Sequence, residues 1–165
     1  MKHYWLIHSL TFASLVLFIV PIKYIKKLFL YALIGGIIYT WGIHLLSIHI
    51  FSFWKFNSGI FILHEVPVFF SICWFFVTLL YGYLLLIYTD YQFYLLIFFA
   101  LWSALMNYFA EASRMLLLID WDLFLTFQFA LFSHVLLLYI LKWMFKVKEL
   151  GSSHENILLF KRKKN

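Results

Sequence analysis

The chain has 165 residues, of which 65% are hydrophobic and 24% aromatic, whereas only 12% are charged. In soluble domains about a quarter of the residues are charged, so this composition excludes an ordinary soluble protein. The length suits about five spans of roughly 20 residues, and we expect no soluble catalytic domain beside them. The sequence therefore predicts an all-α integral membrane bundle of five transmembrane helices.

Five apolar segments follow one another along the chain. The expected spans are residues 4–20, 28–50, 60–88, 93–117 and 123–141, and they form a bundle over residues 1–142. In the second span, Gly35 and Gly36 thin one side of the helix and should let a neighbouring helix approach closely. The third span contains Pro67 near its start, where we expect a kink. Just before this proline lie His64 and Glu65, two ionisable groups in an otherwise apolar segment.

The basic residues predict the orientation of the bundle. Seven of the thirteen Lys and Arg residues lie from Lys142 onward, directly after the last span, and three more follow the first span. Because loops rich in Lys and Arg stay in the cytoplasm, we expect the N-terminus outside and residues 143–165 as a basic cytoplasmic tail. The positive charge thus anchors the chain in the membrane and does not indicate nucleic-acid binding.

Several polar side chains share one predicted depth in the bilayer. With a helical rise of about 1.5 Å per residue, they lie roughly 6 to 9 Å from the outer boundary. The members of this predicted layer are His44, His64, Glu65, Asn107, Glu111 and Arg114. An ionisable residue inside a span is by default a candidate site, because an unpaired charge is costly there. We expect these six residues to wall a small polar pocket in the outer half of the bundle.

A purely structural role is the alternative interpretation of this layer. Glu111 and Arg114, three residues apart, could neutralise each other, with Arg114 extending toward the headgroups. Polar residues such as Asn107 could serve as interhelical hydrogen bonds worth about 0.6 kcal/mol each. Glu65 fits this interpretation less well, because one arginine cannot neutralise two acids.

No catalytic or metal motif is complete in the sequence. His64 and Glu65 begin a pattern like that of zinc proteases, but Val68 stands where the second histidine should be and Pro67 would disturb the helix. Cys73 is the lone cysteine, so a Cys-based metal site is not indicated. A mixed His and Glu site for a divalent metal is chemically open. The sequence assigns no cofactor.

Three segments carry a resemblance to known proteins. Residues 26–29 (Lys-Lys-Leu-Phe) lead into the second span, residues 53–56 (Phe-Trp-Lys-Phe) form an outer aromatic segment, and residues 107–111 place an acid in the fourth span. In this layout the chain resembles a family of small multipass membrane proteins of Bacillus and Clostridium-like Gram-positive bacteria. The resemblance implies a bacterial plasma membrane location and supplies no catalytic residue, since the family has no established activity.

Three functions are compatible with these features. The first is a non-catalytic membrane subunit or accessory protein, whose polar layer only packs the bundle. The second is a transporter or membrane sensor with a site for a polar ligand, cation or proton, in which Glu65 and Glu111 titrate. The third is an intramembrane enzyme acting on a lipid or isoprenoid with one of these acids. The expected partners are the bilayer, anionic lipids contacted by the basic cluster at residues 161–164, and a second copy or another membrane protein.

Overall fold

The computed structural model describes residues 3–57 and 59–145, so most of the predicted cytoplasmic tail and its lipid contact lie outside the described residues. The helices are α1 (Tyr4–Ile19), α2 (Ile22–Ala32), the π-helix η1 (Leu33–Tyr39), α3 (Thr40–His49), α4 (Val68–Ile87), the short 3-10 helix η2 (Thr89–Tyr91), α5 (Gln92–Ala112) and α6 (Leu123–Phe145). The strands are β1 (Trp54–Phe56), β2 (Ile62–Leu63), β3 (Val66–Pro67) and β4 (Leu116–Leu118). Helices α2, η1 and α3 follow without a break and form one long helix over Ile22–His49.

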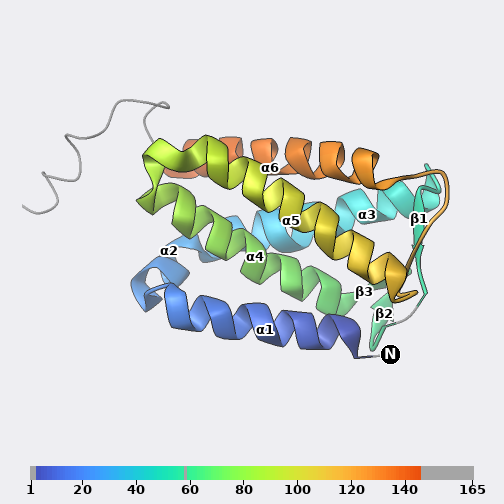
Figure 1. The fold of residues 1–165 in the computed structure, drawn as a ribbon. Coiled ribbons are helices and arrows are strands. Elements are labelled where there is room, and N and C mark those ends of the chain that lie inside the picture. The colour runs from blue at the N-terminus through green and yellow to red at the C-terminus, as the bar shows by residue number, and fades with distance from the viewer. Residues whose placement is uncertain (1–2, 58, 146–165) are drawn as a thin grey trace, which may run out of the picture.

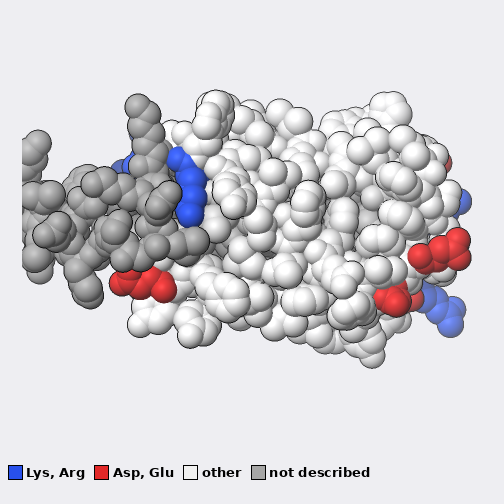
Figure 2. All heavy atoms as spheres, turned by 90° about the horizontal axis from the view of Figure 1, so that it is seen from above, with Lys and Arg blue, Asp and Glu red and all other residues white. Residues whose placement is uncertain are grey.

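The fold is mostly helical, as predicted, and suits a bilayer. Four helices of the described chain are long and apolar enough to cross a membrane: Ile22–His49, Val68–Ile87, Thr89–Ala112 and Leu123–Phe145. Helix α1 is apolar but has only 16 residues. At about 1.5 Å per residue it measures roughly 24 Å, less than the hydrocarbon core of about 30 Å. On the face seen in Figure 2, charged side chains gather at the two ends of the molecule and leave the middle free of them.

Helix α4 is the centre of the bundle. It lies between α1 and α5, and α6 packs beside α5 (Figure 1). Its side chains Leu79, Tyr81 and Leu85 are fully buried. The predicted close approach at the two glycines of the second span is confirmed: a Cβ on Gly36 would lie within 2.7 Å of the amide nitrogen of Phe75 on α4. The absence of a side chain there lets the long helix contact the α4 backbone.

The third span starts later than predicted. Residues 62–67 are not helical but form a hairpin in which β2 pairs with β3. His64 and Glu65 make its turn with φ angles of 48° and 66°, the positive values that a two-residue hairpin loop of type I′ requires. Helix α4 begins only at Val68, because Pro67 favours an extended residue before it and itself serves as the N-cap. The kink expected inside a span is therefore a boundary between hairpin and helix.

The fourth span ends earlier than predicted, at Ala112 instead of residue 117. Arg114 adopts a left-handed conformation with φ of 55°. Its amide donates to the carbonyl of Glu111, and the Met115 amide donates to the carbonyl of Ala110, both at 2.8 Å. These two bonds satisfy the last carbonyls in the manner of a Schellman motif, which ends a helix. The chain then turns into β4, so short strands supplement the predicted all-α bundle.

Strands β1 and β4 form a ribbon across one end of the bundle, which we call the loop end (right in Figure 1). They pair antiparallel, with Trp54 opposite Leu118 and Phe56 opposite Leu116. Because side chains alternate along a strand, Trp54 and Phe56 are buried while Lys55 between them is exposed. The ribbon thus packs two large aromatic rings, those of Trp54 and Phe56, against this end of the helix bundle.

Candidate functional site

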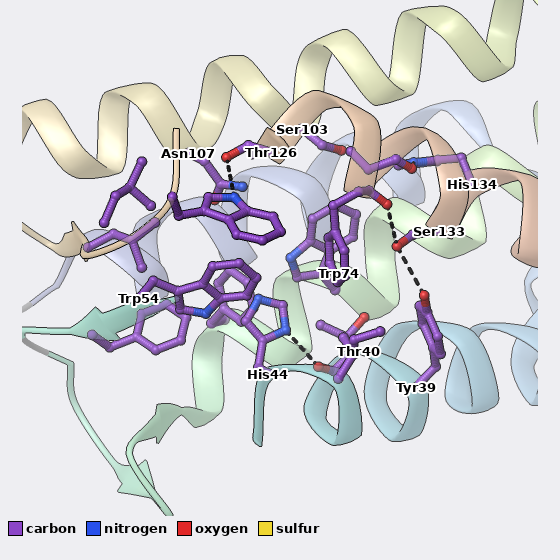
Figure 3. A pocket seen from close by; sticks show the side chains of 18 of the residues that line it. Tyr39, Thr40, His44, Trp54, Trp74, Ser103, Asn107, Thr126, Ser133 and His134 are labelled. Carbon is purple, nitrogen blue, oxygen red and sulfur yellow. Dashed lines mark hydrogen bonds between the residues drawn. The ribbon is translucent and has the colours of Figure 1, made fainter. Parts of the chain in front are cut away.

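A cavity, here called the main cavity, lies under the ribbon between the long helix, α4, α5 and α6 (Figure 3). The enclosed part of the main cavity has a volume of about 50 Å³, which admits several waters. Including its mouth, the empty volume is about 670 Å³. Small-molecule sites often lie between the helices of bundles. The main cavity has this position, and its enclosed part joins a wider mouth.

Two imidazoles line the main cavity and are held in the same way. The Nδ1 atom of His44 lies 2.7 Å from the carbonyl oxygen of Thr40, and Nδ1 of His134 lies 2.7 Å from that of Ala130. A carbonyl oxygen only accepts, so Nδ1 carries the proton in both rings and Nε2 of the uncharged ring is an acceptor. Neither Nε2 atom has a hydrogen-bond partner among the described residues. The cavity wall thus contains two imidazole acceptors that the described residues leave without a donor.

The hydroxyl groups around the cavity are already engaged. Ser133 donates to the carbonyl of Phe129 at 2.9 Å and accepts from the phenol of Tyr39 at 3.0 Å. Thr126 donates to the carbonyl of Asp122 and accepts from the indole nitrogen of Trp121 at 2.9 Å. These bonds fix the side chains of α6 against the long helix and the loop before α6 (Figure 3). The hydroxyls therefore shape the cavity wall and have little capacity left for a ligand.

Two further polar groups in the wall lack partners. The indole nitrogen of Trp54 is buried and makes no hydrogen bond within the described chain. The carboxamide of Asn107 likewise has none among residues 3–57 and 59–145. A buried donor left without an acceptor costs about 1 to 3 kcal/mol. Water or a ligand in the main cavity would offset this cost.

The rest of the wall consists of aromatic and aliphatic side chains without charge. The His44 ring lies 4.7 Å from the centroid of Phe70 and 5.4 Å from that of Trp54. The His134 ring lies 5.0 Å from Tyr81, edge to face, and 6.1 Å from Trp74. No Asp, Glu, Lys or Arg of the described residues lines the cavity. Because a buried charge without a partner is very costly, this wall suits an uncharged molecule.

The structure brings together two of the six residues predicted for a polar pocket. His44 and Asn107 line the main cavity. The others are exposed and lie outside it: His64 and Glu65 in the hairpin turn, Glu111 in the last turn of α5, and Arg114 in the turn that follows. The predicted charged layer is not assembled, because three of these residues sit in backbone turns that a helical depth estimate cannot represent. Among the described residues, no three His, Cys, Asp or Glu side chains gather as a metal site would need.

Sequence reasoning missed His134 and Trp54 as cavity residues. The signal for His134 was its helical spacing from Thr126 and Ala130, which places all three on one face of α6. For Trp54 no such signal existed. It reaches the cavity because β1 pairs with β4, more than sixty residues away along the chain, and that register does not follow from local sequence.

Comparison of the chain with known proteins found no matching family model, no matching curated protein and no matching solved structure. The family resemblance and the bacterial location drawn from the sequence stay predictions. The chain is a mostly helical protein with four helices able to span a membrane and an aromatic cavity at its loop end.

Proposed function

We propose that this protein is a non-catalytic, multi-span membrane protein that binds a small uncharged molecule in the main cavity, as a sensor or accessory subunit. One observation supports the proposal above all: two imidazoles, His44 and His134, line an aromatic cavity, and neither Nε2 has a hydrogen-bond partner among the described residues. An apolar pocket with a few oriented polar groups is the usual form of a small-molecule site. The ligand that fits this site carries a hydrogen-bond donor on an apolar body.

The cavity favours binding over ion transport or catalysis. A cation or proton site would use Glu65 and Glu111, and both are exposed away from the cavity. Nucleophilic catalysis needs a hydroxyl or thiol paired with a base. Ser103 and Ser133 instead donate to the backbone carbonyls of Phe99 and Phe129. The hydroxyls at this site are therefore structural.

We further propose that the protein lies in a bacterial plasma membrane with the loop end outside. Lys23, Lys26 and Lys27 are exposed at the start of α2. The Lys27 Nζ atom lies 5.2 Å from the ring centroid of Phe145, so α2 begins at the end of the bundle where α6 finishes. Positive charge collected at that end supports a cytoplasmic position for it. The main cavity then faces the outer half of the bilayer.

The test is thermal stabilisation of the purified protein by β-naphthol, whose hydroxyl can donate to Nε2 of either imidazole. At a free concentration about 100 times the dissociation constant, binding should stabilise the wild type by about 2.7 kcal/mol. Naphthalene lacks the donor and β-naphthoate is charged, so both should stabilise it less. The Tm is measured in the same detergent for all three compounds.

Ala130→Phe supplies the decisive variant, because Ala130 is buried in the cavity wall and a phenyl ring there fills the space. Ala112→Phe is the matched control, since Ala112 is exposed at the end of α5 and does not line the cavity. We expect β-naphthol to stabilise the control as much as the wild type and to leave the Tm of folded Ala130→Phe unchanged. Equal stabilisation of both variants would refute binding in the main cavity.

A further inference from the structure

A second hollow, here called the side groove, lies between α1, α4 and α5. Its empty volume including the mouth is about 400 Å³. Its wall is built mainly from apolar side chains of these three helices, among them Trp5, Phe12, Val77 and Met106. The polar ring of His8 in this wall is tied by Nδ1 to the carbonyl of Tyr4 at 2.9 Å. The side groove therefore suits hydrocarbon.

The side groove and the main cavity share a wall. Phe70, Trp74, Ser103 and Asn107 line both spaces, so the two spaces adjoin at these side chains. Two of these residues, Phe70 and Trp74, lie one helical turn apart on α4, with ring centroids 6.3 Å apart. The carboxamide of Asn107, which has no hydrogen-bond partner among the described residues, lies at this junction. A molecule that extends from one space into the other has to pass beside Trp74 and Asn107.

The outer rim of the side groove faces the region where lipid surrounds the spans. Trp102 of α5 lines the groove and is 38% exposed. The neighbouring side chains Leu101 and Leu105 on α5 are exposed and apolar. In a bilayer such surfaces contact acyl chains, because lipid-facing groups need no polar partner. A hydrocarbon chain can thus enter the groove sideways from the membrane.

We propose that the ligand is an amphiphile delivered by the bilayer, whose uncharged hydroxyl-bearing aromatic head occupies the main cavity and whose hydrocarbon chain lies in the side groove. This inference rests on the proposed function and specifies its ligand class. The head donates its hydroxyl proton to Nε2 of His44 or His134 and stacks among the aromatic rings. The chain runs past Asn107 and Trp74 to the lipid between α1 and α5.

The test uses the full chain in nanodiscs of phosphatidylglycerol and the probe para-nonylphenol with a photoreactive diazirine near the end of its chain. After irradiation, mass spectrometry maps the adducts. We expect them to concentrate on groove residues such as Met106 and Val77. Unlabelled para-nonylphenol should compete for these adducts about tenfold better than nonylbenzene, because nonylbenzene lacks the hydroxyl that makes the hydrogen bond.

Met106→Trp tests the position of the chain, because Met106 is half-buried in the groove and a larger ring narrows it. We expect groove adducts to fall about tenfold, the effect of losing a well-packed chain segment, while β-naphthol still stabilises the variant. Leu101→Trp is the matched control on the lipid-facing side of α5 and should keep the adducts. If Met106→Trp does not fold, the proposal is still tested in the wild type, by comparing how well para-nonylphenol and nonylbenzene compete for the groove adducts.

The outcomes separate this inference from the proposed function. Adducts that spread over the exposed faces of α5 and α6, or that nonylbenzene removes equally well, would overturn the inference, since bulk lipid chains would then fill the groove. If β-naphthol binds the main cavity and the groove adducts do not compete, the inference fails and the proposed function stands. If β-naphthol does not bind the wild type, the proposed function itself fails.

Discussion

His44 of the long helix and His134 of α6 both line the main cavity. Each ring is fixed through Nδ1 to the carbonyl four residues earlier, at 2.7 Å in both cases. This bond sets the tautomer and the direction of the free Nε2 acceptor without any charged partner. The main cavity therefore suits an uncharged hydrogen-bond donor, in contrast to the charged layer that the sequence suggested.

At the residue scale, His44→Phe should remove one acceptor and preserve the packing. The phenyl ring is close in size to imidazole, and its neighbours Trp54, Phe56 and Phe70 are aromatic. We expect β-naphthol affinity to fall about tenfold, the effect of one net hydrogen bond, while naphthalene affinity stays constant. Isothermal titration of both compounds measures this difference.

His49→Phe is the control for that substitution, because His49 is exposed at the end of the same helix. Its β-naphthol affinity should equal that of the wild type. Should His44→Phe bind β-naphthol and naphthalene as the wild type does, His134 alone would have to supply the acceptor.

At the element scale, helices were predictable and their ends were not. The apolar runs and their length indicate helices because only a helix satisfies its own backbone in lipid. Periodicity, however, cannot tell a short apolar strand from the start of a helix. His64 and Glu65 make a turn that usually selects Asn-Gly, so its sequence signal is weak. Arg114 likewise ends α5 in a conformation that usually selects glycine.

The π-helix η1 belongs to the same scale. It covers Leu33–Tyr39, and Thr40 at its end donates its hydroxyl to the carbonyl of Gly35, five residues back, at 3.2 Å. The wider turn changes which side chains of the long helix face the bundle, and it brings Tyr39 and Thr40 to the main cavity. The sequence contains no marker of this register change, so Tyr39 was not predicted beside His44 in the pocket.

Gly36 tests the packing between the long helix and α4. An added methyl group would collide with the backbone of Phe75, which cannot rotate away, so Gly36→Ala should destabilise the bundle by about 1 to 3 kcal/mol. Gly42→Ala is the matched control on the same helix, because nothing lies within 4 Å of its Cβ position. There the loss of backbone freedom in the unfolded chain should stabilise the helix by about 0.5 to 1 kcal/mol.

Thermal unfolding in one detergent compares the two glycine variants. The expected order of Tm is Gly42→Ala above wild type and Gly36→Ala below it. A Gly36→Ala protein as stable as the wild type would show that the long helix and α4 are not in backbone contact.

At the scale of the whole molecule, the sequence predicted apolar helices long enough to cross a membrane, and four of the described helices have that length and composition. The structure also exposes large apolar side chains such as Phe18, which is 93% exposed, and a bilayer suits such a surface. The site depends on contacts between distant segments. The pairing of β1 with β4 places Trp54 and Leu118 in the wall of the main cavity. The sequence of either strand alone does not predict this pairing.

The orientation also belongs to this scale and predicts a labelling pattern. In a Cys73→Ser background, which removes the buried lone thiol, Phe61→Cys places a thiol at the exposed hairpin and Lys26→Cys places one at the opposite end. In intact cells a membrane-impermeant maleimide should label Phe61→Cys and not Lys26→Cys, because the proposed orientation places the basic end in the cytoplasm. After the membrane is permeabilised, both should react. Labelling of only Lys26→Cys in intact cells would reverse the orientation.

The most direct test of the account is nitrogen NMR of protein labelled with ¹⁵N-histidine, recorded with and without saturating β-naphthol. Assignment comes from the resonances that are lost in His44→Phe and in His134→Phe. We predict that the Nε2 resonance of one or both of these residues shifts as it accepts the ligand's hydroxyl proton, while the exposed His64 stays unchanged. If β-naphthol binds and neither Nε2 resonance moves, the ligand does not occupy the main cavity, and the central claim is contradicted.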